Sequence, residues 1–344
     1  MKLSTLLLSS AALVVAGSAY AADLPAKKGA PAAKAATGCP AFGPGFFQIP
    51  GGDTCIQFSG RVTYDASYSG QSDANTAAKY TQAGGYRLQV DVRNNTEIGA
   101  IRSFIRQEDG GGKKGYIQFA GLTAGLKDSI ADIAGTNPVQ WGAGWSQPST
   151  GIDYTFSAGS TTVKVGLENA ANQNGGAGLS DRPDAIIQVG TSFGPANIKF
   201  AAVSHEAVGA TSGAQQGSAF LGHLDFKATD NVTLIAFGGS SSAAGTYTGS
   251  GKTVDTDASA SYALKGTSIG GEVDLTFGKA SLLLGVRQNV HDGGGTKITD
   301  NSYTVATKYS IANKLDIYPE LLWGDSTSTA GGVDTKTNTS AAYL

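Results

Sequence analysis

Polar and apolar residues alternate along long stretches of this chain. In the clearest stretch, residues 56–68, one parity holds Ile56, Phe58, Val62, Tyr64 and Tyr68, and the other holds Gln57, Ser59, Arg61, Thr63, Asp65 and Ser67. Residues 86–93 repeat the pattern. Because successive side chains of a β-strand point to opposite faces, a period of two indicates strands with one apolar and one polar face.

Weaker alternation continues through the rest of the chain. It covers residues 152–157, 163–168, 187–193, 198–202, 269–277, 282–287, 303–309 and 315–321. The runs between these segments are rich in Gly, Ser and Asn, which is typical of turns and loops. Together the segments predict an all-β domain with about 16 strands.

A domain with so many strands must protect or remove its unpaired sheet edges, either by packing two sheets together or by closing one sheet into a barrel. The longest alternating segment exceeds the roughly 9–11 residues with which a tilted strand crosses a bilayer. Arginines within the strands fit a water-filled lumen, since lipid-facing positions do not tolerate charge. We therefore expect a transmembrane antiparallel β-barrel. A soluble secreted β-sandwich that binds carbohydrate or mediates adhesion is the alternative.

The composition agrees with two interleaved faces. Of 344 residues only 15% are charged, 49 are Gly, and the formal net charge is −2. So few charges argue against a disordered chain and against one that grips nucleic acid. On a barrel, the tyrosines of the apolar parity are expected to contribute to aromatic girdles at the membrane boundaries. They are Tyr64, Tyr68, Tyr86, Tyr154, Tyr303 and Tyr309.

The N-terminus has the features of an export signal. Residues 1–21 contain Lys2, a short apolar run and the sequence Ala19-Tyr20-Ala21, which is typical of a signal-peptide cleavage site. The apolar run is too short for a membrane-spanning helix. Residues 22–38, rich in Ala, Lys and Pro, are expected to form a flexible linker. The barrel would occupy residues 39–344.

Cys39 and Cys55 are the only two cysteines of the chain. In an exported protein they are expected to form a disulfide, which would stabilise the fold by about 3 kcal/mol for a loop of this size. Two free thiols, or a zinc site, are less favoured because the compartment is oxidising and no further Cys or His pair stands nearby.

The segment from Cys39 to Cys55, with its Ile49-Pro50-Gly51 and Thr54-Cys55 sequences, resembles the start of the alphaproteobacterial porins. Residues 93–106 and 116–129 are similar to the same family. The resemblance implies a 16-stranded, trimeric, general-diffusion porin of the outer membrane. In that family the loop after the fifth strand folds into the barrel and narrows the pore.

The resemblance also implies acidic groups on this loop that face a basic cluster on the wall. Lys127 and Asp128 correspond to the start of the loop, which would run to about residue 149. Chains of this family usually end in an aromatic residue. Here either Tyr343 takes that place or the chain is cut a few residues short.

Charged residues that would line such a pore crowd into the first strands. Those expected at the constriction are Arg61, Arg87, Arg93, Arg102, Arg106, Lys127, Asp128 and Asp132. Opposed charges across a lumen create a transverse field that biases which solutes pass. Ordinary solvated surface charges are the alternative interpretation.

The sequence indicates a passive channel for small hydrophilic solutes and ions, with outer-membrane lipid and further copies of the chain as partners. A sugar-selective uptake porin is the alternative, with Trp141 and Trp145 as a stacking platform. Packing of these tryptophans against the wall is favoured. Gly249–Thr253 lacks the first Gly of a phosphate-binding loop, and His205-Glu206 lacks the second His of a zinc-protease motif. We therefore expect no enzyme, no cofactor, no metal site and no nucleic-acid partner.

Overall fold

A computed structural model describes residues 38–71, 79–133, 148–170, 182–209, 213–248, 265–293 and 295–343. The expected signal peptide (1–21), and the linker (22–38) apart from Gly38, lie outside these residues and stay predictions. The strands are β1 (Phe47–Gln48), β2 (Cys55–Gln71), β3 (Lys79–Thr96), β4 (Gly99–Glu108), β5 (Lys113–Phe119), β6 (Leu122–Lys127), β7 (Ser149–Ala158), β8 (Thr161–Glu168), β9 (Asp184–Phe193), β10 (Ala196–Gly209), β11 (Gly213–Thr229), β12 (Val232–Ser242), β13 (Lys265–Phe277), β14 (Ala280–Gly293), β15 (Thr296–Ala312), β16 (Leu315–Ile317), β17 (Glu320–Ala330) and β18 (Val333–Tyr343).

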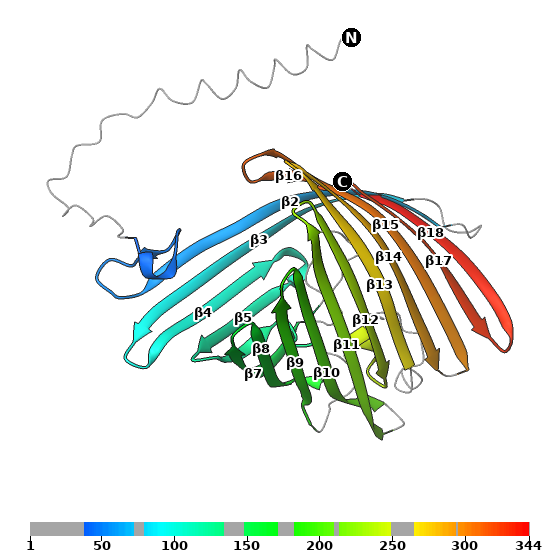
Figure 1. Ribbon diagram of the computed structural model, residues 1–344, viewed down its shortest axis with the longest axis horizontal. Coiled ribbons are helices and arrows are strands. Elements are labelled where there is room, and N and C mark those ends of the chain that lie inside the picture. The colour runs from blue at the N-terminus through cyan, green and yellow to red at the C-terminus, as the bar shows by residue number, and fades with distance from the viewer. Residues whose placement is uncertain are drawn as a thin grey trace, which may run out of the picture.

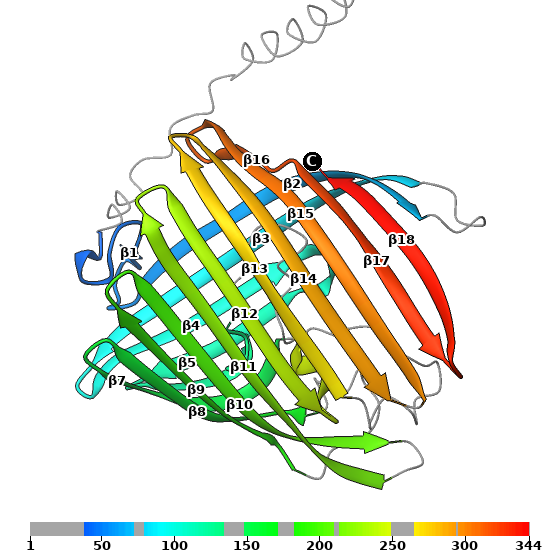
Figure 2. The same ribbon diagram turned by 45° about the vertical axis from the view of Figure 1, so that its right-hand side comes forward.

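The strands close into one antiparallel barrel (Figure 1 and Figure 2). From β2 to β15, and then through β17 and β18, each strand pairs with the next. β18 then pairs with β2, from Thr339 opposite Gln71 to Tyr343 opposite Ser67. Strands β2–β15, β17 and β18 make a ring of 16, which confirms the predicted architecture. The β-sandwich alternative is wrong, because all the strands of the described residues belong to one sheet, which closes on itself.

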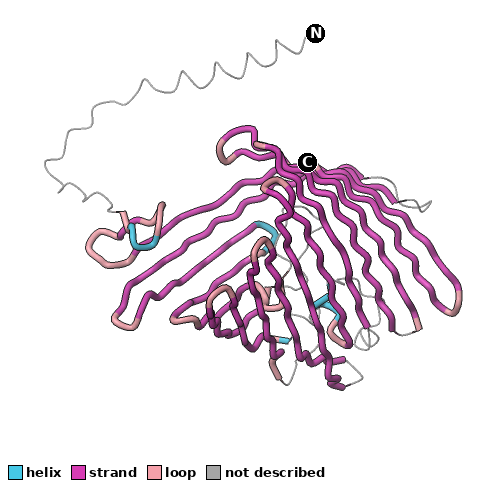
Figure 3. The backbone as a smooth tube through the Cα atoms, in the orientation of Figure 1, coloured by secondary structure: helices cyan, strands magenta, loops and turns pink. Residues whose placement is uncertain are grey.

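Two short strands lie outside this ring: β1 pairs with the start of β2, and β16 pairs with the end of β15. Figure 3 shows how little of the described chain is helical. The helical pieces whose bounds lie within the described residues are the 3-10 turns η2 (Pro40–Phe42), η3 (Asp109–Gly111) and η6 (Gly245–Thr248). Among the residues described, no helix is both long and apolar enough to cross a membrane.

The predicted alternation is confirmed, and the apolar parity faces outward. Val62 is 86% exposed and Phe58 60%, whereas inward-facing Asp91 is only 7% exposed. The tyrosines expected at the membrane boundaries, from Tyr64 to Tyr309, are all exposed on the outer face. In a barrel the outward apolar side chains meet lipid, and the inward polar ones line the lumen.

The two ends of the barrel differ. At one end the strands are joined by short turns, such as residues 194–195 and 278–279, where Gly194 and Gly278 take left-handed φ values of 55° and 58° that suit tight hairpins. The strand ends that the long connections join, such as Lys127 and Ser149, Glu168 and Asp184, and Ser242 and Lys265, all lie at the other end. This asymmetry is typical of outer-membrane barrels, with short turns toward the periplasm.

The predicted disulfide is present. Cys39 and Cys55 are joined with an S–S distance of 2.06 Å, which ties the segment before β1 to the first residue of β2. The rings of Phe42 and Phe46 lie on the guanidinium of Arg93, at 5.8 and 4.8 Å from its central carbon. The disulfide-bounded segment therefore packs against the wall at the short-turn end.

Candidate functional site in the barrel lumen

Two carboxylates on the inner wall each hold a pair of arginines. Glu108 of β4 accepts Arg87 and Arg106, each with an Nε–Oε1 distance of 2.7 Å. Asp91 of β3 binds Arg93 and Arg102, with Nη2–Oδ2 distances of 3.1 and 2.9 Å. Because one anion meets two cations in each bridge, each keeps a net positive charge.

Four cations form a basic wall on successive strands, namely Arg61 on β2, Arg87 on β3, Arg106 on β4 and Lys114 on β5. Arg61 stands directly opposite Arg87 in the register, and Arg106 stands opposite Lys114. No carboxylate of the described chain lies within ion-pair distance of Arg61. The basic wall is therefore an array of partly neutralised cations facing the lumen.

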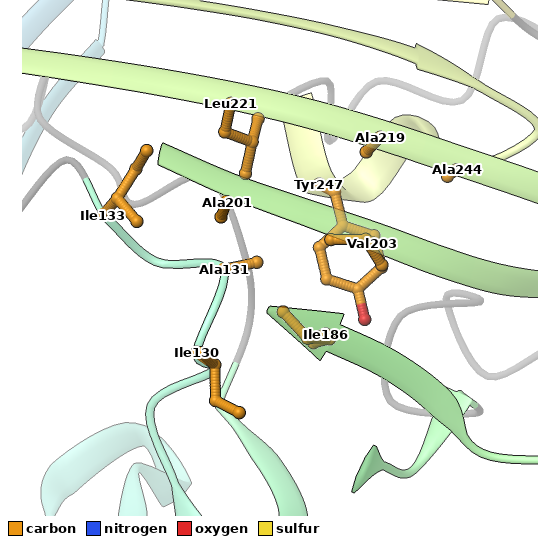
Figure 4. Packing of buried hydrophobic residues seen from close by; sticks show 10 residues of the cluster. All are labelled: Ile130, Ala131, Ile133, Ile186, Ala201, Val203, Ala219, Leu221, Ala244 and Tyr247. Atoms are coloured by element: carbon orange, nitrogen blue, oxygen red, sulfur yellow. The ribbon is translucent and has the colours of Figure 1, made fainter. Parts of the chain in front are cut away.

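The loop after the fifth ring strand, β6, begins inside the barrel. Asp128 pairs with Lys114 of the basic wall. Ile130, Ala131 and Ile133 are 4%, 0% and 0% exposed. Figure 4 shows them among inward-facing apolar residues of β9, β10 and β11, such as Ile186, Val203 and Leu221. Residues 134–147, with Trp141 and Trp145, lie outside the described residues.

A buried charge cluster lies under the start of this loop. Nζ of Lys127 is 3.0 Å from Oδ1 of Asp153 on β7 and 3.6 Å from Oε1 of Glu168 on β8. The same Glu168 oxygen accepts the backbone N–H of Ile130 at 2.7 Å. All three charged side chains are nearly inaccessible, so the cluster ties β6, β7, β8 and the loop together.

A lumenal cavity of about 500 Å³ is lined by residues of the loop start and of the basic wall, which the Asp128–Lys114 ion pair joins directly. Arg106, Lys114 and Asp132 line it together with Phe104 and Tyr116. The two aromatic rings stack at 5.1 Å. Burial, followed by the neighbouring Asp128 carboxylate, raises the pKa of Asp132 to about 6. Both signs of charge therefore meet across one water-accessible space.

Sequence reasoning did not single out three parts of this site. Glu108 and Lys114 were not among the charges expected to line the pore. Glu108 binds Arg106 of its own strand and Arg87, which stands opposite it in the register. Residues 243–248, which the sequence assigned to a Gly/Ser-rich turn, instead lie in the lumen, where Ala244 and Tyr247 join the cluster of Figure 4. The lone tyrosine in that Gly/Ser run was the one local signal.

Comparisons with known proteins agree with this architecture. A family model described as "Porin subfamily" matches residues 26–343. Porin Omp2b of Brucella canis is 29% identical over 209 residues, which cover 51% of this chain and 56% of that protein. Porin Omp2b of Brucella suis biovar 1 is 30% identical over 211 residues, with the same coverage. The match thus spans little more than half the length of these relatives.

Solved structures are similar in fold at low identity. The outer membrane channel DcaP of Acinetobacter baumannii has a TM-score of 0.66 at 12% identity, covering 85% of this chain and 97% of that one. An anion-selective porin from Comamonas acidovorans has a TM-score of 0.53 at 12% identity, with 84% and 98% covered. At such identities the likeness extends to the barrel itself.

Proposed function

The chain belongs to the porin subfamily, and from this membership and the lumen we propose that it is a passive outer-membrane channel for small hydrophilic solutes and ions. The observation that carries the proposal is the basic wall together with the loop carboxylates: Asp128 pairs with Lys114, and Asp132 lines the same polar cavity as Arg106 and Lys114. Such opposed charges orient polar solutes and bias which ions pass. Conduction of this kind uses no cofactor and involves no catalysed step.

We infer that the constriction lies between the basic wall and the loop that starts at Asp128. The direct test is conductance of the refolded protein in a planar lipid bilayer, with ion selectivity taken from the reversal potential. Stepwise channel insertion supports the proposal, and a folded protein that conducts no ions overturns it. Saturable block by a sugar would favour the sugar-selective alternative that rests on Trp141 and Trp145.

Selectivity should respond to pH through Asp132. Because its pKa is raised to about 6, this carboxyl is charged above that pH and neutral below it. Lowering the pH from about 7.5 to about 5 should therefore shift the reversal potential toward anions. Asp132→Asn, which removes the charge at every pH, should abolish most of this shift. A shift of equal size in the variant would assign the effect to other groups.

We also propose that three copies associate through the outer face of β5–β9. Strands β5, β6 and β8 have only 7, 6 and 8 residues, fewer than the roughly 9–11 that span a bilayer at a tilt. A lipid bilayer in contact with these short strands would have to become thinner locally. A groove of about 780 Å³ overlaps this face and extends to β11; it is lined by apolar side chains such as Ile152, Leu167 and Phe220. A second copy of the barrel would cover this surface without such thinning.

Photo-crosslinking tests this interface. A photoreactive amino acid in place of Ile187, which is exposed on β9, should yield covalent dimers and trimers on irradiation in the membrane. The matched control is the same replacement at Val286, an equally exposed apolar residue on the outer face of β14. It should give lipid adducts. Equal multimer yields from both positions, or none from Ile187, would contradict the assignment.

A further inference from the structure

A second segment of chain enters the lumen from the loop after β12. Residues 243–248 fold inward and end in the 3-10 turn η6. Tyr247 is 0% exposed, Thr248 1% and Ala244 2%. A run rich in Gly and Ser has little apolar surface of its own, so specific contacts must hold it there.

The principal contact is a buried cluster of three polar side chains. The Tyr247 hydroxyl donates to Oδ2 of Asp184, the first residue of β9, at 2.5 Å. Nδ1 of His205 on β10 lies 2.8 Å from Oδ1 of the same carboxylate. The Tyr247 and His205 rings meet edge to face at 5.8 Å. Burial and the Asp184 charge raise the pKa of Tyr247 far above its ordinary value, so the hydroxyl keeps its proton and donates.

Residues 243–248 and the start of the loop after β6 contribute to one apolar cluster. Ala244 and Tyr247 belong to the same packed group as Ile130, Ala131 and Ile133, against the inner faces of β9–β11 (Figure 4). A second hydrogen bond, between the hydroxyls of Ser241 and Thr248 at 3.0 Å, ties the turn to its own strand. The described parts of the two loops, residues 128–133 and 243–248, therefore pack together against the inner faces of β9–β11.

We propose that residues 243–248 form a second constriction element, held in place by Tyr247 and Asp184 as positioning residues, which sets the pore's open cross-section together with residues 128–133. The proposal rests on the channel function above and adds a specific determinant of pore size. Release of the Tyr247 hydroxyl from Asp184 frees the turn and widens the pore on the side of β9–β13.

Single-channel recording of Tyr247→Phe tests this. Loss of a hydrogen bond to a buried carboxylate should raise the occupancy of a released, higher-conductance level by about tenfold or more. The matched control is Tyr318→Phe, which removes a hydroxyl that donates to Asp316 at 3.3 Å near the short turns. The control should conduct like the wild type. Asp184→Asn, which weakens the same bond from the acceptor side, should shift the levels in the same direction.

A designed cross-link supplies the rescue. Ser241→Cys with Thr248→Cys, in the Tyr247→Phe background, should form a disulfide because the two native hydroxyls are in contact. Oxidation should then restore the wild-type level and reduction should remove it again. Wild type and Tyr247→Phe treated with the same reductant control for the native Cys39–Cys55 bond.

Unchanged conductance in both Tyr247→Phe and Asp184→Asn would overturn the second constriction element, as would an equal change in Tyr318→Phe. A wild-type protein that conducts no ions would instead overturn the channel proposal itself. The two failures are therefore distinguishable.

Discussion

Replacing Arg87 and Arg106 together with glutamine is expected to shift the channel's cation-to-anion permeability ratio toward cations by about sevenfold. Both arginines bind Glu108, so the double variant turns this bridge from one net positive charge to one net negative charge. At about 7 Å in water each unit charge contributes about 0.6 kcal/mol to the energy of a passing ion. Two such changes, roughly halved by screening at 0.1 M salt, lower the energy of a cation and raise that of an anion by about 0.6 kcal/mol each. The difference of about 1.2 kcal/mol gives the stated ratio.

The measurement is the reversal potential in a salt gradient across a planar bilayer. Arg87→Lys with Arg106→Lys keeps both charges and should leave the reversal potential near that of the wild type. Neutralising Arg93 and Arg102 changes the Asp91 bridge by the same charge at a different level of the barrel, so the two double variants compare the levels. If the glutamine pair causes no shift, Arg87 and Arg106 do not lie at the narrowest part.

Lys127→Met should be among the most destabilising substitutions in the wall. It leaves the carboxylates of Asp153 and Glu168 buried without their cation, and breaking a buried ion pair from one side costs about 3–5 kcal/mol. Burial here is nearly complete, with side-chain exposures of 8% for Lys127, 7% for Asp153 and 0% for Glu168. The lost charge also loosens Glu168, which holds the backbone of Ile130.

Urea unfolding of the barrel in detergent or vesicles measures this loss. Lys227→Met is the matched control, because Lys227 pairs with Asp230 in full solvent at a turn and such pairs add little. Adding Asp153→Asn and Glu168→Gln to Lys127→Met should recover part of the loss by removing the unpaired charges. A cost no larger than that of Lys227→Met would mean that the cluster does not support the wall.

Features that depend on the alternation of polar and apolar residues along a strand could be predicted from the sequence. The outward positions of Val62 and Tyr64 and the inward position of Arg61 follow from local alternation, and the number of alternating segments gives about 16 strands. The Cys39–Cys55 bond follows from there being just two cysteines in an exported chain. Each of these inferences needs only neighbouring residues or a count.

Features that depend on register or on tertiary contact could not be predicted. The bond from Arg87 to Glu108 forms only because β3 and β4 pair with these residues side by side. Lys127, expected among the pore-lining charges, does line the lumenal cavity. Its burial beside Asp153 and Glu168 depends on contacts between strands that the sequence does not show. Tyr247 lies in the lumen, where its hydroxyl donates a hydrogen bond to Asp184, a residue far away in the sequence.

The pairing of β18 with β2 has a consequence for the order of folding. Every other ladder in the ring joins neighbouring segments, so each hairpin pays a small loop-closure entropy. The ladder between residues 67–71 and 339–343 joins opposite ends of the described chain and carries the largest closure entropy. Until it forms, two unpaired strand edges face the membrane, where unsatisfied backbone groups are very unfavourable. Ring closure should therefore be late and cooperative. A barrel in which β18 and β2 are not yet paired should be the short-lived, association-prone species on the folding pathway.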